Sequence, residues 1–270
     1  MFHLVARSSG YRLVFSDWEE GVRLWDTVVG ACPGLVALCV MPDHVHVLVP
    51  NDVRSRLGLA LGGYARWRNA RREERGTLWA PLPDAERLAD AQKVRRSVRY
   101  VHLNPCRAGL VADPLGWPLS THLDAVGLVA RPVRRRAPDV LRFHAYVSGD
   151  PSAKVQGTEL PVASTVAPDV GAVLDAVSVV ARQPVARLGE RGPARMFAIR
   201  ALRTLTPARA GEIAVHVGAS RPTVARVKPG LDADLRLVER WAGDPRCSPL
   251  DDGVLLACLH RSGRWRNYRR

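Results

Sequence analysis

The chain has 270 residues and a formal net charge of +14, so it is long enough for two domains and favours a polyanionic partner, with nucleic acid as the first candidate. No apolar stretch is long enough to span a membrane, and the N-terminus lacks a signal-peptide pattern, so we expect a cytoplasmic protein. The five cysteines are scattered without a CxxC spacing, which argues against a zinc knuckle and a disulfide framework.

The first 41 residues predict a strand, a helix and a second strand. Residues 4–6 and 11–15 form apolar runs separated by a polar turn, which predicts one strand that continues through the turn or bends there. Residues 17–29 carry apolar side chains at near-helical spacing, and residues 35–41 predict the next strand. This order with short turns predicts an α+β fold, with helices on one face of an antiparallel sheet.

Two histidines stand in the strand predicted at 44–49. Because strand side chains alternate, His44 and His46 share one face, with valines on the other. Two imidazoles on one rigid face can chelate a divalent metal. The alternative is a pair of ordinary strand histidines. A further alternative is a nucleotide hydrolase of the histidine-triad kind. Such an enzyme would have a third histidine at position 48, where this chain has Leu48.

A long helix predicted at 53–75 is rich in arginine and contains two aromatic residues, Tyr64 and Trp67. Basic side chains interleaved with aromatic ones suit a nucleic-acid backbone with stacked bases. The alternative is a solvated helix face. The residues that we expect to bind DNA here are Arg66, Arg68 and Arg71.

The pattern becomes helical again from residue 84, and Pro105 is expected to end this helix at about Asn104. Tyr100 and Asn104 lie four residues apart in the last turn and therefore share one face. A phenol and an amide oxygen in this arrangement can serve as a nucleophile and a third metal ligand. Tyr64 is the alternative nucleophile.

Four motifs in register carry a resemblance to a known family. They are MPDHVHVLV at 41–49, GTLW at 76–79, RYVHLNPCRAGLV at 99–111 and WPLST at 117–121. Together they strongly resemble the single-tyrosine HUH transposases, in the branch associated with repetitive extragenic palindromes. The resemblance covers about residues 1–150. Two departures stand out: position 43 is Asp where Asn or Glu is more usual, and residues 80–87 lack the basic, aromatic strand of the family.

The resemblance implies a ferredoxin-like α+β core that binds single-stranded hairpin DNA. His44 and His46 would hold a Mg²⁺ or Mn²⁺ ion, and Asn104 would complete the protein ligands. Tyr100 would attack the scissile phosphate and leave a 5′-phosphotyrosine link. Covalent attachment would conserve the phosphodiester energy for rejoining. The alternative is a domesticated, non-catalytic DNA-binding protein that retains the fold.

The rest of the chain predicts a linker and a second, all-α domain. We expect the first domain at 1–130, a linker region at 131–168, the second domain at 169–245 and a basic tail at 246–270. The tail ends in a basic, aromatic stretch with Trp265 and Tyr268, which we expect to order on DNA.

Residues 210–227 fit a helix-turn-helix. Ala214 is small where two helices cross, Gly218 makes the turn, and Ser220 can cap the second helix. An ordinary helical hairpin is the alternative. The preceding helices resemble the C-terminal DNA-binding domain of the replication initiator DnaA. The side chains expected to contact duplex DNA are Arg221, Thr223 and Arg226. The expected partners are therefore hairpin DNA at the first domain and duplex DNA at the second, with a homodimer left open.

Overall fold

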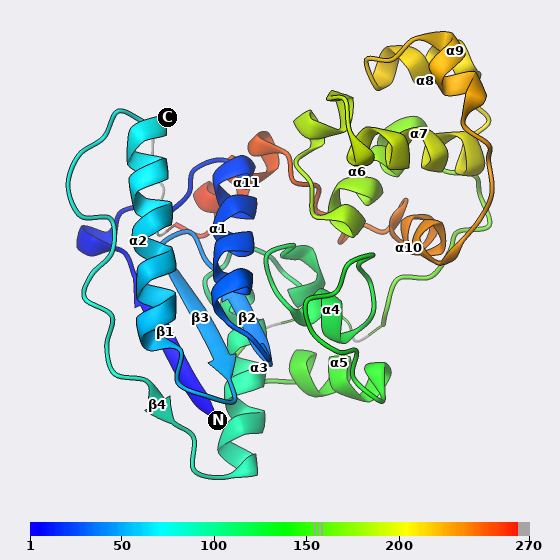
Figure 1. Ribbon diagram of the computed structural model, residues 1–270. Coiled ribbons are helices and arrows are strands. Elements are labelled where there is room, and N and C mark those ends of the chain that lie inside the picture. Colours follow the sequence, from blue (N-terminus) through cyan, green and yellow to red (C-terminus); the bar gives the residue numbers. More distant parts are fainter. Residues whose placement is uncertain (154, 156, 158, 264–270) are drawn as a thin grey trace.

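The computed structural model describes residues 1–153, 155, 157 and 159–263 (Figure 1). Its first half contains a four-stranded sheet in the order β2-β3-β1-β4, in which every neighbouring pair is antiparallel. The elements follow in the order β1 (Phe2–Arg7), α1 (Trp18–Ala31), β2 (Ala37–Val40), β3 (His44–Val49), α2 (Arg54–Arg71) and β4 (Glu86–Arg87). This βαββαβ order with split pairing is the ferredoxin-like topology. The predicted α+β class with an antiparallel sheet is confirmed.

The strand predicted at 11–15 does not form. A short 3₁₀ helix at Ser9–Tyr11 follows β1, and Gly10 has a left-handed φ of 65° that turns the chain away from the sheet. The Val14 N–H then donates to the carbonyl of Pro42 at 2.7 Å, outside any strand ladder.

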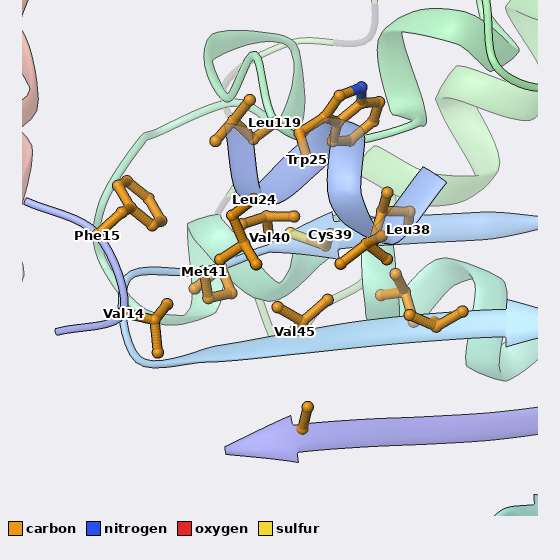
Figure 2. Packing of buried hydrophobic residues seen from close by; sticks show 14 of the residues in the cluster. Val14, Phe15, Leu24, Trp25, Leu38, Cys39, Val40, Met41, Val45 and Leu119 are labelled. Atoms are coloured by element: carbon orange, nitrogen blue, oxygen red, sulfur yellow. The ribbon is translucent and has the colours of Figure 1, made fainter. Parts of the chain in front are cut away.

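Helices α1 and α2 cover one face of the sheet. Helix α1 begins where the Asp17 carboxylate accepts the N–H of Glu20 at 2.9 Å, as expected for an N-cap. Leu24 and Trp25 of α1 lie over Val45 of β3, and this packing continues along the sheet (Figure 2). The valines of β3 therefore form the floor of the main core, and the histidines between them point to the opposite face.

Helix α3 (Ala91–Arg107) lies against β2 and β3 on that opposite face. The prediction of helices on one face is therefore correct for α1 and α2 but not for α3. The prediction that Pro105 ends the helix is also wrong. Proline removes one N–H donor, but the N–H of Ala108 still reaches the Asn104 carbonyl at 2.9 Å, so one further turn forms.

The second half is helical and has a core of its own. It comprises helices α4 (His122–Ala125), α5 (Val140–Ser148), α6 (Val170–Ala181), α7 (Pro193–Leu205), α8 (Ala210–His216), α9 (Arg221–Arg226) and α10 (Ala233–Trp241). Side chains from 115–129 join this core, and the Trp241 indole N–H donates to the Leu128 carbonyl at 3.0 Å. The expected linker contains α5, and its Leu160 is buried in the second core.

The last helix returns to the first core. Helix α11 (Asp252–Arg261) buries Leu255 and Leu259 in the cluster that contains α1 and the sheet. The Trp18 backbone N–H and indole N–H donate to Asp252 and to the Asp251 carbonyl, both at 2.9 Å. Much of the expected tail is therefore a packed helix, while its terminal stretch 264–270 lies outside the described residues. Among the helices of the described chain, none is both long and apolar enough to cross a bilayer.

Candidate active site

The His44 and His46 side chains lie together on the α3 side of the sheet. Their ring centroids are 4.8 Å apart, with the ring planes at 85°. Both side chains are buried, although they are polar. The strand alternation that places Val45 in the main core also orients both imidazoles toward α3.

Helix α3 brings Tyr100 and Asn104 to these histidines. The Asn104 Nδ2 lies 2.8 Å from the His46 Nε2, and the Tyr100 ring lies edge-on to the His46 ring, with centroids 5.4 Å apart. Asn104 is buried, whereas Tyr100 is 39% exposed. The site is therefore closed around the histidines and the amide and open to solvent at the phenol.

Two further side chains hold the histidines from behind, and the sequence analysis missed the first of them. The His3 Nε2 lies 3.1 Å from the His46 Nδ1, with the two rings stacked at 5.3 Å. The Asp43 carboxylate lies 2.6 Å from the His44 Nδ1. Val5 pairs with His46, and His3 lies two residues before Val5, so its side chain is on the same face of the sheet as His46. His3 was missed because the strand predicted from the sequence began at residue 4.

Burial favours the neutral form of the His46 and His3 side chains. The pKa of His46 lies well below its ordinary value, first because of burial and then because its charged form interacts unfavourably with His44, His3 and Arg7. Burial likewise lowers the pKa of His3, against the opposing effect of Glu86. Neutral imidazole is the form that binds a metal ion, so the electrostatics suit His46 as a ligand.

The available donors fit a divalent ion held by two imidazoles and an amide. Within the described residues, no group of three or more His, Cys, Asp or Glu side chains could hold a metal ion. The Asn104 amide lies beside His46 and can serve as a third ligand. Imidazole and amide oxygen suit Mn²⁺ and, with more water ligands, Mg²⁺.

The structure places two of the three α2 arginines in the protein's own ion pairs. Arg68 is 3% exposed and donates to Glu74 at 2.8 Å. Arg71 donates to Asp17 at 2.7 Å and to Glu20 at 3.1 Å. Helix α2 also lies on the face of the sheet opposite to the histidine pair. Arg68 and Arg71 therefore tie α2 to the start of α1, and of the three arginines only the exposed Arg66 still suits a DNA contact.

Tyr64 is unsuitable as the alternative nucleophile. It is 2% exposed, and its hydroxyl donates to the Val14 carbonyl at 2.6 Å. Burial and the nearby Glu20 carboxylate hold its pKa well above the ordinary value. A nucleophile must reach its substrate, and Tyr64 packs its ring on the sheet instead.

A row of basic side chains lies on the same side of α3 as Tyr100. Lys93, Arg96 and Arg107 lie seven residues before, four residues before and seven residues after Tyr100, so all four side chains share one side of the helix. All three basic side chains are exposed, and the Arg107 guanidinium carbon lies 4.9 Å from the Tyr100 ring centroid. The basic residues expected to bind DNA were predicted on α2, and this row on α3 was not among them.

Helices α8 and α9 pack against each other at the far end of the second half (Figure 1). Gly218 has a left-handed φ of 57° between them, and the Ser220 hydroxyl accepts the Thr223 N–H at 3.3 Å. Ile213, Val217 and Val224 are fully buried. Arg221 and Arg226 are exposed, while the Thr223 hydroxyl lies 2.8 Å from the Ser220 hydroxyl.

Comparison with known proteins gives limited similarity. No family model and no curated protein matches the chain. A solved structure described as a REP-associated tyrosine transposase bound to a REP hairpin is 19% identical, with a TM-score of 0.39. The match covers 52% of this chain and 86% of that one. At this level of similarity, the chemistry has to be argued from the residues of the chain itself.

Proposed function

We propose that the protein is a metal-dependent DNA strand transferase of the transposase type, which cleaves single-stranded DNA through Tyr100. The observation that carries this proposal is the convergence of His44, His46, Asn104 and Tyr100 from β3 and α3. His46 and Asn104 are 58 residues apart in sequence, yet their side chains lie within 2.8 Å. The motifs that contain these four residues resemble the single-tyrosine HUH transposases. A merely structural histidine pair would not require an exposed tyrosine at its edge.

The proposed reaction exchanges one phosphodiester for another. A bond forms between the Tyr100 Oη and the phosphorus, the bond from phosphorus to the 3′ oxygen breaks, and the phenol proton ends on the 3′-hydroxyl. The divalent ion, held by His44, His46 and Asn104, would supply positive charge to the phosphoryl oxygens. The 5′-phosphotyrosine keeps the strand attached until a 3′-hydroxyl reverses the exchange.

The chain's own residues orient the reaction. The Arg107 guanidinium lies against the Tyr100 ring, where it restrains the phenol and places a positive charge beside the incoming phosphate. Lys93 and Arg96 continue this positive surface along α3. We infer that the single strand crosses α3 at Tyr100, with Arg66 on the opposite helix layer as a separate, outer contact for a hairpin.

Incubation with Mn²⁺ and single-stranded hairpin oligonucleotides from the DNA flanking the gene is expected to give a covalent protein–DNA adduct. Tyr100→Phe removes the nucleophile and is expected to reduce adduct formation by at least about 10³-fold. Denaturing gels and peptide mass spectrometry measure the adduct and its position. Chelation of the metal, or His44→Ala, is expected to abolish it as well.

Tyr146 provides the matched control, because Arg99 lies over its ring at 4.7 Å just as Arg107 lies over Tyr100. Tyr146→Phe should leave the adduct unchanged, since its ring does not contact the histidine pair. An adduct that persists in Tyr100→Phe would contradict the proposed nucleophile. Hairpin binding without cleavage, unaltered by Tyr100→Phe or His44→Ala, would favour the non-catalytic alternative.

We further propose that α8 and α9 form a duplex-binding helix-turn-helix. The support is the buried Ile213, Val217 and Val224 beneath the two helices, with Arg221 and Arg226 exposed on α9. The N-terminus of α9 and these arginines suit a groove and its phosphates. This module would add target-site binding to the strand transferase.

The double variant Arg221→Ala/Arg226→Ala is expected to weaken duplex binding about 10-fold or more, with a shallower salt dependence for each lost phosphate contact. Fluorescence anisotropy at several salt concentrations measures both effects. The exposed Arg236 on α10 provides the control, since Arg236→Ala removes the same charge elsewhere. Equal losses of duplex affinity in both variants would indicate a general charge effect and argue against α9 as the recognition helix.

A further inference from the structure

The two candidate ligand histidines are held in different ways at their Nδ1 atoms. A carboxylate, Asp43, lies 2.6 Å from the His44 Nδ1. A third imidazole, His3, lies 3.1 Å from the His46 Nδ1. In both cases the partner contacts Nδ1 and not Nε2, and the His46 Nε2 faces Asn104 at 2.8 Å.

The hydrogen bonds around His46 fix one direction of donation. The Asn104 amide nitrogen can only donate, so the His46 Nε2 is the acceptor and its proton lies on Nδ1. The His46 Nδ1–H then donates to the His3 Nε2, which places the His3 proton on its own Nδ1. Glu86 lies 3.6 Å from that nitrogen. The donor and acceptor roles therefore agree along the whole series of side chains, from Asn104 through His46 and His3 to Glu86.

The edge strand explains how Glu86 reaches this position. Strand β4 is two residues long and follows a proline-rich segment, yet it pairs Glu86 directly with His3 and Arg87 with Phe2. Side chains directly opposite in an antiparallel pair lie on the same face. This short pairing sets a carboxylate beside the outer nitrogen of His3, whose side chain is otherwise 11% exposed.

We propose that His3 is a positioning residue that selects the Nδ1–H form of His46 and so presents the His46 Nε2 to the divalent ion. This inference rests on the proposed function for the identity of the ion. A group that accepts a hydrogen bond from the far nitrogen of a ligand histidine fixes the tautomer and the ring orientation of that histidine. His3 differs from Asp43 because a neutral imidazole orients its neighbour without adding negative charge at the back of the site.

The first test uses the metal-free protein and reads the tautomer directly. Long-range ¹H–¹⁵N spectra of the ¹⁵N-labelled chain at pH 7.5 are expected to show His46 protonated at Nδ1. His3→Leu removes the acceptor at Nδ1, so the Asn104 amide can rotate and accept from an Nε2–H, and a mixture of the two His46 tautomers is expected. His3→Gln retains an acceptor oxygen and should restore the Nδ1–H form. Circular dichroism checks that each variant is folded.

The second test measures Mn²⁺ binding by calorimetry. His3→Leu is expected to weaken Mn²⁺ affinity about 10- to 100-fold, with His3→Gln recovering most of the loss. Glu86→Gln should give a smaller effect than His3→Leu, because it acts one step further out. His46 that stays fully Nδ1-protonated in His3→Leu, or Mn²⁺ affinity equal to the unaltered protein's, would overturn the proposal. A tautomer change in a protein that binds no Mn²⁺ would instead refute the proposed metal function while supporting the positioning role.

Discussion

Arg182→Met is expected to destabilise the protein by about 3–5 kcal/mol, because it leaves a buried carboxylate without its cation. Arg182 closes α6 with a left-handed φ of 47° and is 6% exposed. Its guanidinium pairs with Asp124, which is fully buried, and donates to the Pro118 and Ser120 carbonyls at 2.9 and 3.1 Å. Equilibrium urea unfolding measures the loss.

The position of Arg182 makes this loss larger than that of a single surface pair. Its guanidinium carbon also lies 4.3 Å from the ring centroid of Trp25 on α1. One side chain therefore connects α6 of the second half with α1 and with the segment that follows η2 (Pro114–Gly116). The expected result includes a looser attachment of the two halves, visible as faster proteolysis between them.

The matched control is Arg200, which forms a similar ion pair with Asp232 at 2.8 Å but is exposed. Arg200→Met should cost less than about 1 kcal/mol, because water screens and replaces an exposed pair. The double variant Arg182→Met/Asp124→Leu should recover part of the loss, since no unpaired charge remains. Equal effects of Arg182→Met and Arg200→Met would contradict the assigned role of Arg182.

Acidification from pH 7 to pH 5 is expected to lower the free energy of unfolding steeply through a row of buried histidines. The His122 Nε2 lies 3.0 Å from the His144 Nδ1, and its Nδ1 lies 3.5 Å from the His102 Nδ1. Burial holds the pKa of His122 well below its ordinary value, with further lowering from His102, His144 and Arg134. Burial and the nearby Arg246 lower the pKa of His144 to about 4.

The sign follows from which state takes up protons. Above about pH 6.5 these histidines are neutral in both states, so stability is at its full value. Below that pH the unfolded chain binds protons that the folded chain refuses. Each such histidine then lowers the free energy of unfolding by about 1.4 kcal/mol per pH unit. For His144 this continues until about pH 4, where the folded form also becomes protonated.

His144→Asn is expected to reduce the slope of stability against pH between pH 6.5 and 4.5, because it removes one of the titrating groups. Urea unfolding at half-unit pH steps measures this slope. Within the described residues the His144 Nε2 has no hydrogen-bond partner, so the substitution does not remove a bond at that atom. His216→Asn on the exposed face of α8 should leave the slope unchanged. An unchanged slope in His144→Asn would show that carboxylates dominate the acid response.

Local patterns predicted most of the elements. The apolar spacing located α1, and the alternation of valine and histidine located β3 with its faces. The two wrong predictions, the end of α3 and the strand at 11–15, share a physical cause: both depend on which hydrogen-bond partners the folded chain supplies. A proline removes one donor but does not decide whether the neighbouring carbonyls find others, so α3 ran past Pro105. Residues 11–15 form no strand, because Leu13, Val14 and Phe15 pack in the core without a ladder partner.

The sequence by itself determined the side chains that could carry the chemistry, because the members of each pair are close along the chain. His44 and His46 lie two residues apart in one strand, and Tyr100 and Asn104 lie four residues apart in one helix. Only the tertiary structure decided what surrounds them. It placed α3 across the sheet from α1 and α2, brought His3 beside His46, and engaged Arg68 and Arg71 in ion pairs within the protein's own chain. Such choices depend on which distant segments pack together, and burial and charge pairing, which set them, are properties of the folded chain.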